Sequence, residues 1–215
     1  MRSVPRFPAL VACAVLLSGF VFTQEQAPSA PAQPPAAEAP TKKSKAEKAP
    51  KQGPSVKVPA IAARPDDVAT LDGIMKTFYD VISGPAGEPR QWSRDRTLYM
   101  PGVRFVAMSV NEKGRPVARI AGHQQFVDVA NAILVKDGFF EQEIHRTTER
   151  FGNIAHIWST YESRNKADGP IIARGINSIE LFFDGTRWWI ASNLWDDERP
   201  DSPIPAEYLP VAGGK

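Results

Sequence analysis

Residues 174–195 read RGINSIELFFDGTRWWIASNLW, and this stretch decides the fold. Two runs of alternating apolar and polar residues flank Asp184-Gly185, which is the pattern of a β-hairpin closed by a two-residue turn. Such a turn pairs Asn177 with Ser192. The face expected to be buried carries Ile179, Leu181, Phe183, Trp188, Ile190 and Leu194. The opposite face carries Arg174, Ser178, Glu180, Arg187, Trp189, Asn193 and Trp195.

A second hairpin precedes this one, with Gly152-Asn153 joining residues 139–151 to residues 154–163. Strand alternation then sets which side chains share a face. The inward face is expected to carry Phe140, Gln142, Ile144, Ala155, Ile157, Ser159 and Tyr161. The outward face is expected to carry Glu141, Glu143, His145, Glu149, His156, Trp158 and Glu162.

The residues before these hairpins predict helices and two shorter strands. One helix is expected over residues 66–82, where apolar side chains recur at helical spacing: Val68, Leu71, Met75, Phe78 and Ile82. A short helix is expected at 89–97 and strands at 103–110 and 116–120. A further helix at 122–136 should turn Phe126, Val129, Ala130, Ile133 and Leu134 inward. This order predicts an α+β domain whose N-terminal helices cover one side of a curved antiparallel sheet.

Residues 1–23 have the layout of a secretory signal peptide. Arg2 and Arg6 precede an apolar run from Ala9 to Phe22, which is too short to cross a hydrocarbon core of about 30 Å as a helix. We expect export to the periplasm or the exterior. The alternatives are a membrane anchor formed by an uncleaved signal and a lipid attached to Cys13. Cleavage would remove the only cysteine, which would exclude disulfides and thiolate metal sites.

Residues 24–64 are rich in Pro, Ala and Lys and have no periodic apolar face, which predicts a disordered tether. Its six lysines between Lys42 and Lys57 could contact an anionic envelope surface, a solvated spacer being the alternative. Residues 1–64 hold 9 Lys+Arg and 3 Asp+Glu, which leaves 17 and 21 for the rest. The predicted domain, residues 65–200 with a tail at 201–215, is therefore mildly acidic, and we expect no nucleic-acid partner.

Several motifs together resemble one superfamily. They are the segments 174–181, 184–190 and 195–200, and the alternation Ala155, Ile157, Ser159, Tyr161. In this order they resemble the nuclear-transport-factor-2-like (NTF2-like) superfamily, especially its SnoaL-like and related bacterial branches, over about residues 66–198. The resemblance implies a cone-shaped, cystatin-like fold with a pocket between sheet and helices, often dimeric through the outer sheet face. Its members include isomerases, dehydratases, hydrolases, binding modules and transport adaptors, so it implies no single function.

Candidate ligand-binding side chains are those expected to face this pocket: Tyr79, Trp92, Tyr99, Gln142, Ser159, Tyr161, Asn177 and Ser192. They combine aromatic walls with a few polar groups, as small-molecule sites do. Asn177 and Ser192 could orient a ligand or satisfy each other. A second set of aromatic residues is expected to point outward and to meet a second copy of the chain, unless residues 199–210 fold over it: Trp158, Phe182, Trp189 and Trp195.

The sequence offers few candidate catalytic residues. The resemblance implies an Asp base or an Asp–His pair, and the candidates are Asp95 and His123. No HExxH, GxSxG or glycine-rich phosphate motif occurs, and no metal or cofactor is expected.

We therefore expect a domain that binds a small, largely apolar molecule. The alternatives are a cofactor-free isomerase, dehydratase or hydrolase that uses the same pocket, and a dimeric interaction module with a filled pocket. A buried acid or base that reaches the cavity would favour the enzyme. A packed interior would favour the interaction module.

Overall fold

The structure is a computed structural model that describes residues 55–211; the predictions for the signal peptide, Cys13 and most of the tether lie outside these residues. The helices are α1 (Pro65–Val68), α2 (Leu71–Asp80), α3 (Trp92–Arg96), α4 (His123–Asp137) and the short 3₁₀ helix η1 (Ala206–Tyr208). The strands are β1 (Tyr99–Val110), β2 (Pro116–Ala121), β3 (Phe140–Phe151), β4 (Ile154–Arg164), β5 (Ala173–Phe183) and β6 (Trp188–Asp197).

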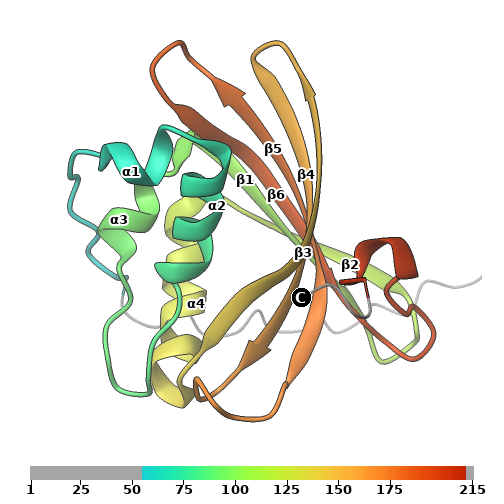
Figure 1. The fold of residues 1–215 in the computed structure, drawn as a ribbon. Coiled ribbons are helices and arrows are strands. Elements are labelled where there is room, and N and C mark those ends of the chain that lie inside the picture. Colours follow the sequence, from blue (N-terminus) through green and yellow to red (C-terminus); the bar gives the residue numbers. More distant parts are fainter. Residues whose placement is uncertain (1–54, 212–215) are drawn as a thin grey trace, which may run out of the picture. The chain divides into compact units, whose positions relative to one another are not determined.

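The six strands form one open sheet in the order β2-β1-β6-β5-β4-β3, with the larger helices on one face (Figure 1). The α+β prediction is confirmed, with one difference: β1 and β6 run parallel, whereas every other neighbouring pair is antiparallel. After the β1–β2 hairpin the chain crosses through α4 and returns from the far edge of the sheet. β6, the last strand, therefore pairs with the remaining edge of β1 and runs parallel to it.

The core lies between the sheet and the helices. Its fully buried side chains come from both layers: Ile74, Met75, Val81, Leu98, Phe105, Val127, Ile157, Ile179 and Ile190. Phe126 of α4 stacks on Phe105 of β1 with ring centroids 4.4 Å apart, which fixes α4 on the sheet. Within residues 55–211, no helix has the length and apolar content needed to cross a bilayer.

The single helix expected at 66–82 is divided into α1 and α2. Thr70 is extended and accepts a hydrogen bond from the backbone N–H of Gly73 at 2.9 Å, so it caps α2 in place of continuing α1. A Cβ on Gly73 would overlap the carbonyl oxygen of Asp66, so the close approach of the two helices requires glycine there.

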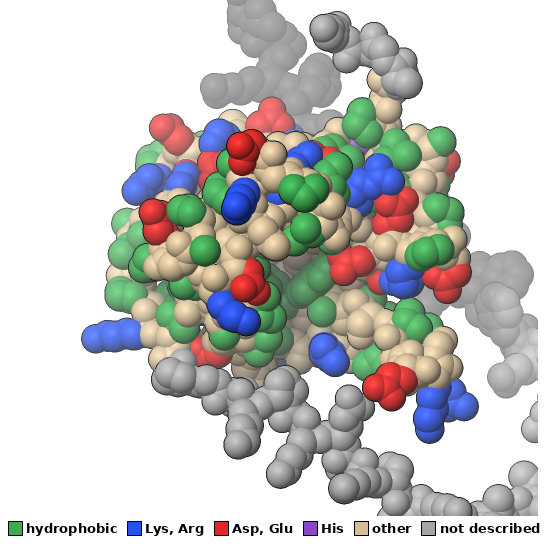
Figure 2. Space-filling view, turned by 90° about the horizontal axis from the view of Figure 1, so that it is seen from below, with side chains coloured by type: hydrophobic (Ala, Val, Ile, Leu, Met, Phe, Trp, Pro, Cys, Tyr) green, Lys and Arg blue, Asp and Glu red, His purple; other side chains and the backbone are tan. Residues whose placement is uncertain are grey.

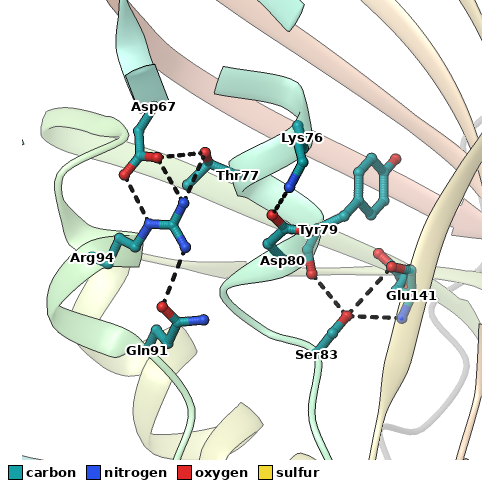
Figure 3. Close-up of polar contacts among 9 residues, drawn as sticks. All are labelled: Asp67, Lys76, Thr77, Tyr79, Asp80, Ser83, Gln91, Arg94 and Glu141. Atoms are coloured by element: carbon teal, nitrogen blue, oxygen red, sulfur yellow. Dashed lines mark hydrogen bonds and ion pairs between the residues drawn. The ribbon is translucent and has the colours of Figure 1, made fainter. Parts of the chain in front are cut away.

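An ion pair then joins α1 to α3. The guanidinium of Arg94 donates to both carboxylate oxygens of Asp67, at 2.8 and 2.7 Å, and Thr77 of α2 donates to the same carboxylate (Figure 3). Asp67 is only 4% exposed, and Arg94 holds its pKa below the ordinary value. The contact is a bidentate pair with an added hydroxyl, so the buried charge is satisfied.

Two predictions about α4 are wrong. Val129 and Ile133 were expected to face inward, but they are 49% and 59% exposed. The inward stripe is Phe126, Val127, Ala130 and Leu134, rotated from the expected one. α4 packs chiefly against β1 and β2, and the side of α4 that carries Val129 and Ile133 faces away from the sheet.

The folded unit is longer than residues 65–200 at both ends. Residues 55–58 were placed in the tether, but Val58 is buried and the N–H of Val56 donates to Asp128 of α4 at 2.8 Å. At the other end, Tyr208 of η1 lies over Trp158, with ring centroids 5.6 Å apart. Its carbonyl oxygen accepts a hydrogen bond from Thr160 at 2.6 Å. The tail therefore packs on the outer face of the sheet.

Both long hairpins contain a β-bulge that reverses the faces beyond it. Between β3 and β4 the expected pairing holds from the turn to His145 and then shifts by one residue. Between β5 and β6 the turn centres on Gly185-Thr186, so each residue of β5 near the turn pairs with a residue of β6 two positions later than expected. Farther from the turn, the pairing shifts by one more residue between Leu181 and Glu180. Consequently Glu141, Glu143, Asn193 and Trp195 lie on the inner face, and Gln142, Ser192 and Leu194 on the outer face.

Candidate functional site

An irregularity in β1 builds a cavity at the end of the sheet. Five residue steps of β1, from Tyr99 to Arg104, span the same stretch as two steps of β6, from Ile190 to Ser192. The extra residues loop outward because Pro101 has no N–H for the ladder and Gly102 has a φ of 84°. The resulting cavity has a volume of about 300 Å³, and its lining includes Met100, Val103, His123 and Trp189.

Asp95 and His123 form a close pair beside this cavity. Oδ2 of Asp95 lies 2.7 Å from Nε2 of His123, and the hydroxyl of Tyr99 donates to Oδ1 at 3.2 Å. Asp95 is fully buried, whereas the imidazole retains 14% of its surface and lines the cavity. The helix α3 places the carboxylate and the first residue of α4 places the imidazole. A buried carboxylate thus orients a ring that reaches the cavity.

The carboxyl group of Asp95 is subject to opposing effects. Burial is the largest effect and holds the pKa above its ordinary value, while the contacts with His123 and Tyr99 lower it in part. Burial and the neighbouring carboxyl also raise the pKa of Tyr99 well above the ordinary value, so this hydroxyl stays protonated and donates. Within residues 55–211 Nδ1, the second imidazole nitrogen of His123, has no hydrogen-bond partner.

Four predicted pocket residues lie together on the inner side of the sheet. The hydroxyl of Tyr79 lies 2.6 Å from that of Ser159 and accepts a hydrogen bond from Nδ2 of Asn177 at 3.2 Å. Ser159 donates to Oε1 of Glu143 at 2.5 Å. Tyr161 shares this face, and its hydroxyl donates to Asp197 at 2.5 Å. All four predicted side chains are no more than 5% exposed, so their hydrogen bonds to one another, to Glu143 and to Asp197 satisfy them inside the packed layer.

Glu141 joins this inner face because of the bulge in β3. Burial, and secondarily the charge of Asp197, raise the pKa of its carboxyl to about 8. The backbone N–H of Glu141 donates to Ser83 Oγ at 3.0 Å, and Ser83 donates to the carbonyl of Tyr79, which ties β3 to the end of α2 (Figure 3). Near-neutral pH therefore lies within the titration range of this carboxyl.

The remaining predicted pocket residues lie elsewhere. Trp92 donates its indole N–H to Asn131 at 2.7 Å and lines a separate hollow beside α3. Tyr99 lines the cavity at His123. Gln142 points to the outer face, where it donates to Glu162 at 2.6 Å. Ser192 pairs with Glu180, so the predicted pairing of Asn177 with Ser192 is wrong.

The four tryptophan and phenylalanine residues expected on the outer face lie in four different environments. Trp195 lies on the inner face, where it contacts Phe126. Trp189 lines the cavity beside His123, and Trp158 is covered by Tyr208. Phe182 remains partly exposed, opposite Trp189. The first of these positions corrects the prediction, and the cause is the bulge in the last hairpin.

Sequence reasoning missed the residues that the bulges and the β1 loop bring into play. The sequence predicts Glu141 and Glu143 on the outer face, and it indicates no pocket role for Arg96, Met100 or Arg104. Pro101-Gly102 was the one available signal, because this pair within a strand pattern indicates a bulge. The face of the domain in Figure 2 is hollowed near its centre, and basic and acidic side chains are interspersed across it.

Comparisons with known proteins found similar solved structures only. Neither a protein-family model nor a curated protein matches the sequence. A protein of unknown function with a cystatin-like fold from Nostoc punctiforme is 10% identical, with 60% of this chain and 89% of that chain covered and a TM-score of 0.45. An NTF2-like protein of unknown function from Shewanella baltica is 10% identical, with 59% and 87% covered and a TM-score of 0.39.

A protein of unknown function from Mycobacterium tuberculosis is 14% identical, with 66% of this chain and 83% of that chain covered and a TM-score of 0.46. The open six-stranded sheet with helices on one face is the α+β arrangement that the order of elements predicted, and membership of the NTF2-like superfamily stays a prediction.

Proposed function

We propose that this chain is an exported domain that binds a small, largely apolar molecule in the cavity at His123 and moves a proton on it with the Asp95–His123 pair. One observation carries the proposal: a fully buried carboxylate lies 2.7 Å from an imidazole that lines a cavity of about 300 Å³. Paired groups of this kind, with one pKa shifted by burial, are concentrated at functional sites. The proposed reaction class is isomerisation or dehydration without a cofactor.

The geometry supports a general-base role for His123. With Asp95 ionised, Nε2–H of His123 donates to the carboxylate and the lone pair of Nδ1 is left to accept a proton. A C–H bond of the bound molecule breaks, its proton moves to Nδ1, and the electron pair stays on the substrate. The imidazolium is stabilised by Asp95. Return of the proton to another carbon completes an isomerisation, and its delivery to a leaving hydroxyl completes a dehydration.

The contacts favour this proposal over a filled interaction module. The layer between sheet and helices is indeed packed, because Tyr79, Ser159 and Asn177 satisfy one another there. The cavity, however, lies at the β1 loop, outside that layer, and a buried acid backs it. A packed interior is therefore compatible with a ligand site.

The test is proton exchange in deuterated buffer. The full chain is incubated with a panel of small cyclic ketones and β-hydroxy ketones, and ¹H NMR follows loss of the proton next to the carbonyl. We expect exchange with the unchanged protein and its loss in His123→Asn. Asp95→Asn should lower the rate by about 10- to 1,000-fold, because the imidazole loses its orienting partner.

The matched control is His145→Asn, since His145 lies on β3 and makes no contact with this cavity. It should leave the exchange rate unchanged. Exchange that survives His123→Asn in a folded protein would contradict the assignment, as would the absence of exchange across the whole panel.

The homodimer stays a prediction with its own test. Leu194 and Ile120 flank Val106 on the outer face and are 40% and 67% exposed, which leaves an apolar strip beside the tail. We propose that a second copy covers this strip. Native mass spectrometry should show a dimer that Leu194→Lys dissociates, and a monomeric unchanged chain would refute it.

A further inference from the structure

We infer that the cavity at His123 takes a small molecule that bears a carboxylate on an aromatic or otherwise apolar ring body. The inference rests on the site of the proposed function and adds the class of substrate. Its first basis is charge: among the residues that the structure describes, the cavity lining contains two arginines, Arg96 and Arg104, and no acidic residue. Asp95 lies behind the imidazole of His123 and is fully buried.

Neither of these two arginines is paired with an acidic side chain in the described part of the chain. Five arginines of the domain form ion pairs with acidic side chains: Arg94, Arg146, Arg164, Arg174 and Arg199. Arg96 and Arg104 form none with any of the residues at 55–211. Acidic residues outnumber basic ones from residue 65 onward, 21 to 17, so carboxylate partners are abundant in the domain. Two uncompensated guanidinium groups on one cavity therefore make a local positive potential in an acidic protein.

Guanidinium groups select carboxylates by shape as well as by charge. Their planar N–H groups match the two oxygens of a carboxylate, which makes bidentate contacts possible. Gly122 and Gln124, where α4 begins, line the same cavity, and the N-terminal end of a helix also favours an anion. The guanidinium groups of Arg96 on α3 and Arg104 on β1 and the N-terminal end of α4 thus all favour an anion in the cavity.

Most of the rest of the lining is apolar, and Trp189 is held in place by its neighbours. Tyr99, Met100, Val103 and Trp189 supply most of it. The indole N–H of Trp189 donates to Asp184 at 2.6 Å, and Arg187 lies 3.7 Å over its ring. A wall that is fixed before binding loses little entropy when a ligand enters. The volume, about 300 Å³, is at the lower end of the range for small-molecule sites and suits a body of one or two rings.

The test compares a carboxylate with its neutral isostere. The full chain is titrated with 2-naphthoate and with 2-naphthamide by isothermal calorimetry at low salt. We expect the carboxylate to bind at least about 10-fold more tightly than the amide, with an advantage that shrinks as salt is added. Arg104→Gln and Arg96→Gln should each remove at least about 5-fold of the affinity for the carboxylate and little of that for the amide.

Arg119→Gln is the matched control, because Arg119 is an exposed arginine on β2 that does not line the cavity. It should leave both affinities unchanged. Equal binding of the two probes, absence of binding by both, or full affinity for naphthoate in the double variant of Arg96 and Arg104 would overturn the inference.

One further variant separates this inference from the proposed catalysis. His123→Asn removes the base but neither arginine, so it should still prefer naphthoate. If naphthoate binds but no ketone exchanges its proton, the carboxylate site stands and the proposed reaction fails. If ketones exchange but the amide binds as well as the acid, the reaction stands and the carboxylate inference fails.

Discussion

Replacing Glu141 by Gln should stabilise the folded chain at alkaline pH and have little effect at acid pH. Burial and the charge of Asp197 raise the pKa of Glu141 from the ordinary 4.5 to about 8. Between these two values the folded chain binds the Glu141 proton more strongly than the unfolded chain does. The free energy of unfolding therefore falls as pH rises from about 4.5 to about 8, and glutamine, which does not titrate, removes that loss.

The magnitude follows from the two pKa values. One pH unit between them corresponds to about 1.4 kcal/mol, so the full difference would amount to at most about 5 kcal/mol. The side chain of Glu141 is only partly buried, and water screens part of the effect. We therefore expect Glu141→Gln to gain about 2 kcal/mol relative to the unchanged protein between about pH 5 and about pH 8.

The assay is urea unfolding of both proteins, followed by tryptophan fluorescence, at about pH 5 and about pH 8. Taking the difference between the proteins at each pH cancels the titration of every other group. Glu149→Gln is the control, since Glu149 lies on the same strand but is exposed; its difference should stay within about 0.5 kcal/mol at both values. A Glu141→Gln difference that does not change with pH, or that falls as pH rises, would refute the reasoning.

Three other substitutions test the packing around the site, each by chemical unfolding of the full chain. Arg90→Met should cost about 2–4 kcal/mol, because the buried guanidinium donates to four backbone carbonyls, those of Gly84, Pro85, Glu88 and Leu134; a cost near zero would contradict this. Gly175→Ala should cost about 1–3 kcal/mol, since the added Cβ would overlap the hydroxyl of Tyr161 and the carbonyl of Asp196; unchanged stability would show that β5 moves freely. Thr70→Ala should cost about 1 kcal/mol through the lost cap on α2, with Thr70→Ser retaining most of the stability.

The candidate site could be predicted only in fragments. Asp95 and His123 were singled out as residue types, but they are 28 positions apart and belong to different helices. Their contact depends on how α3 and α4 pack against the sheet, which no local pattern encodes. Tyr79, Ser159 and Asn177 lie together as expected, because strand alternation puts Ser159 and Asn177 on the inner face and Tyr79 comes from a helix that covers this face. Whether they line open space or bond to one another depends on packing distances.

The sequence by itself determined the order of the elements, the positions of both long hairpins and the inner faces close to their turns. These follow from local causes: alternation with a period of two, and turn residues that suit positive φ or side-chain capping. The pairing next to the last turn is shifted by two positions from the expected one. The predicted faces near this turn are still correct, because a shift of two preserves which face each side chain occupies.

Only the tertiary structure decided where that alternation breaks. A bulge adds one unpaired residue and reverses every face beyond it, and stretches such as Glu141-Gln142-Glu143 are polar in either register, so the sequence does not mark it. The outward loop of β1 and the approach of Asp95 to His123 likewise depend on neighbours distant along the chain. Both the cavity and the inward carboxylates arise at these breaks, because a side chain's surroundings are set by the strands and helices packed against it.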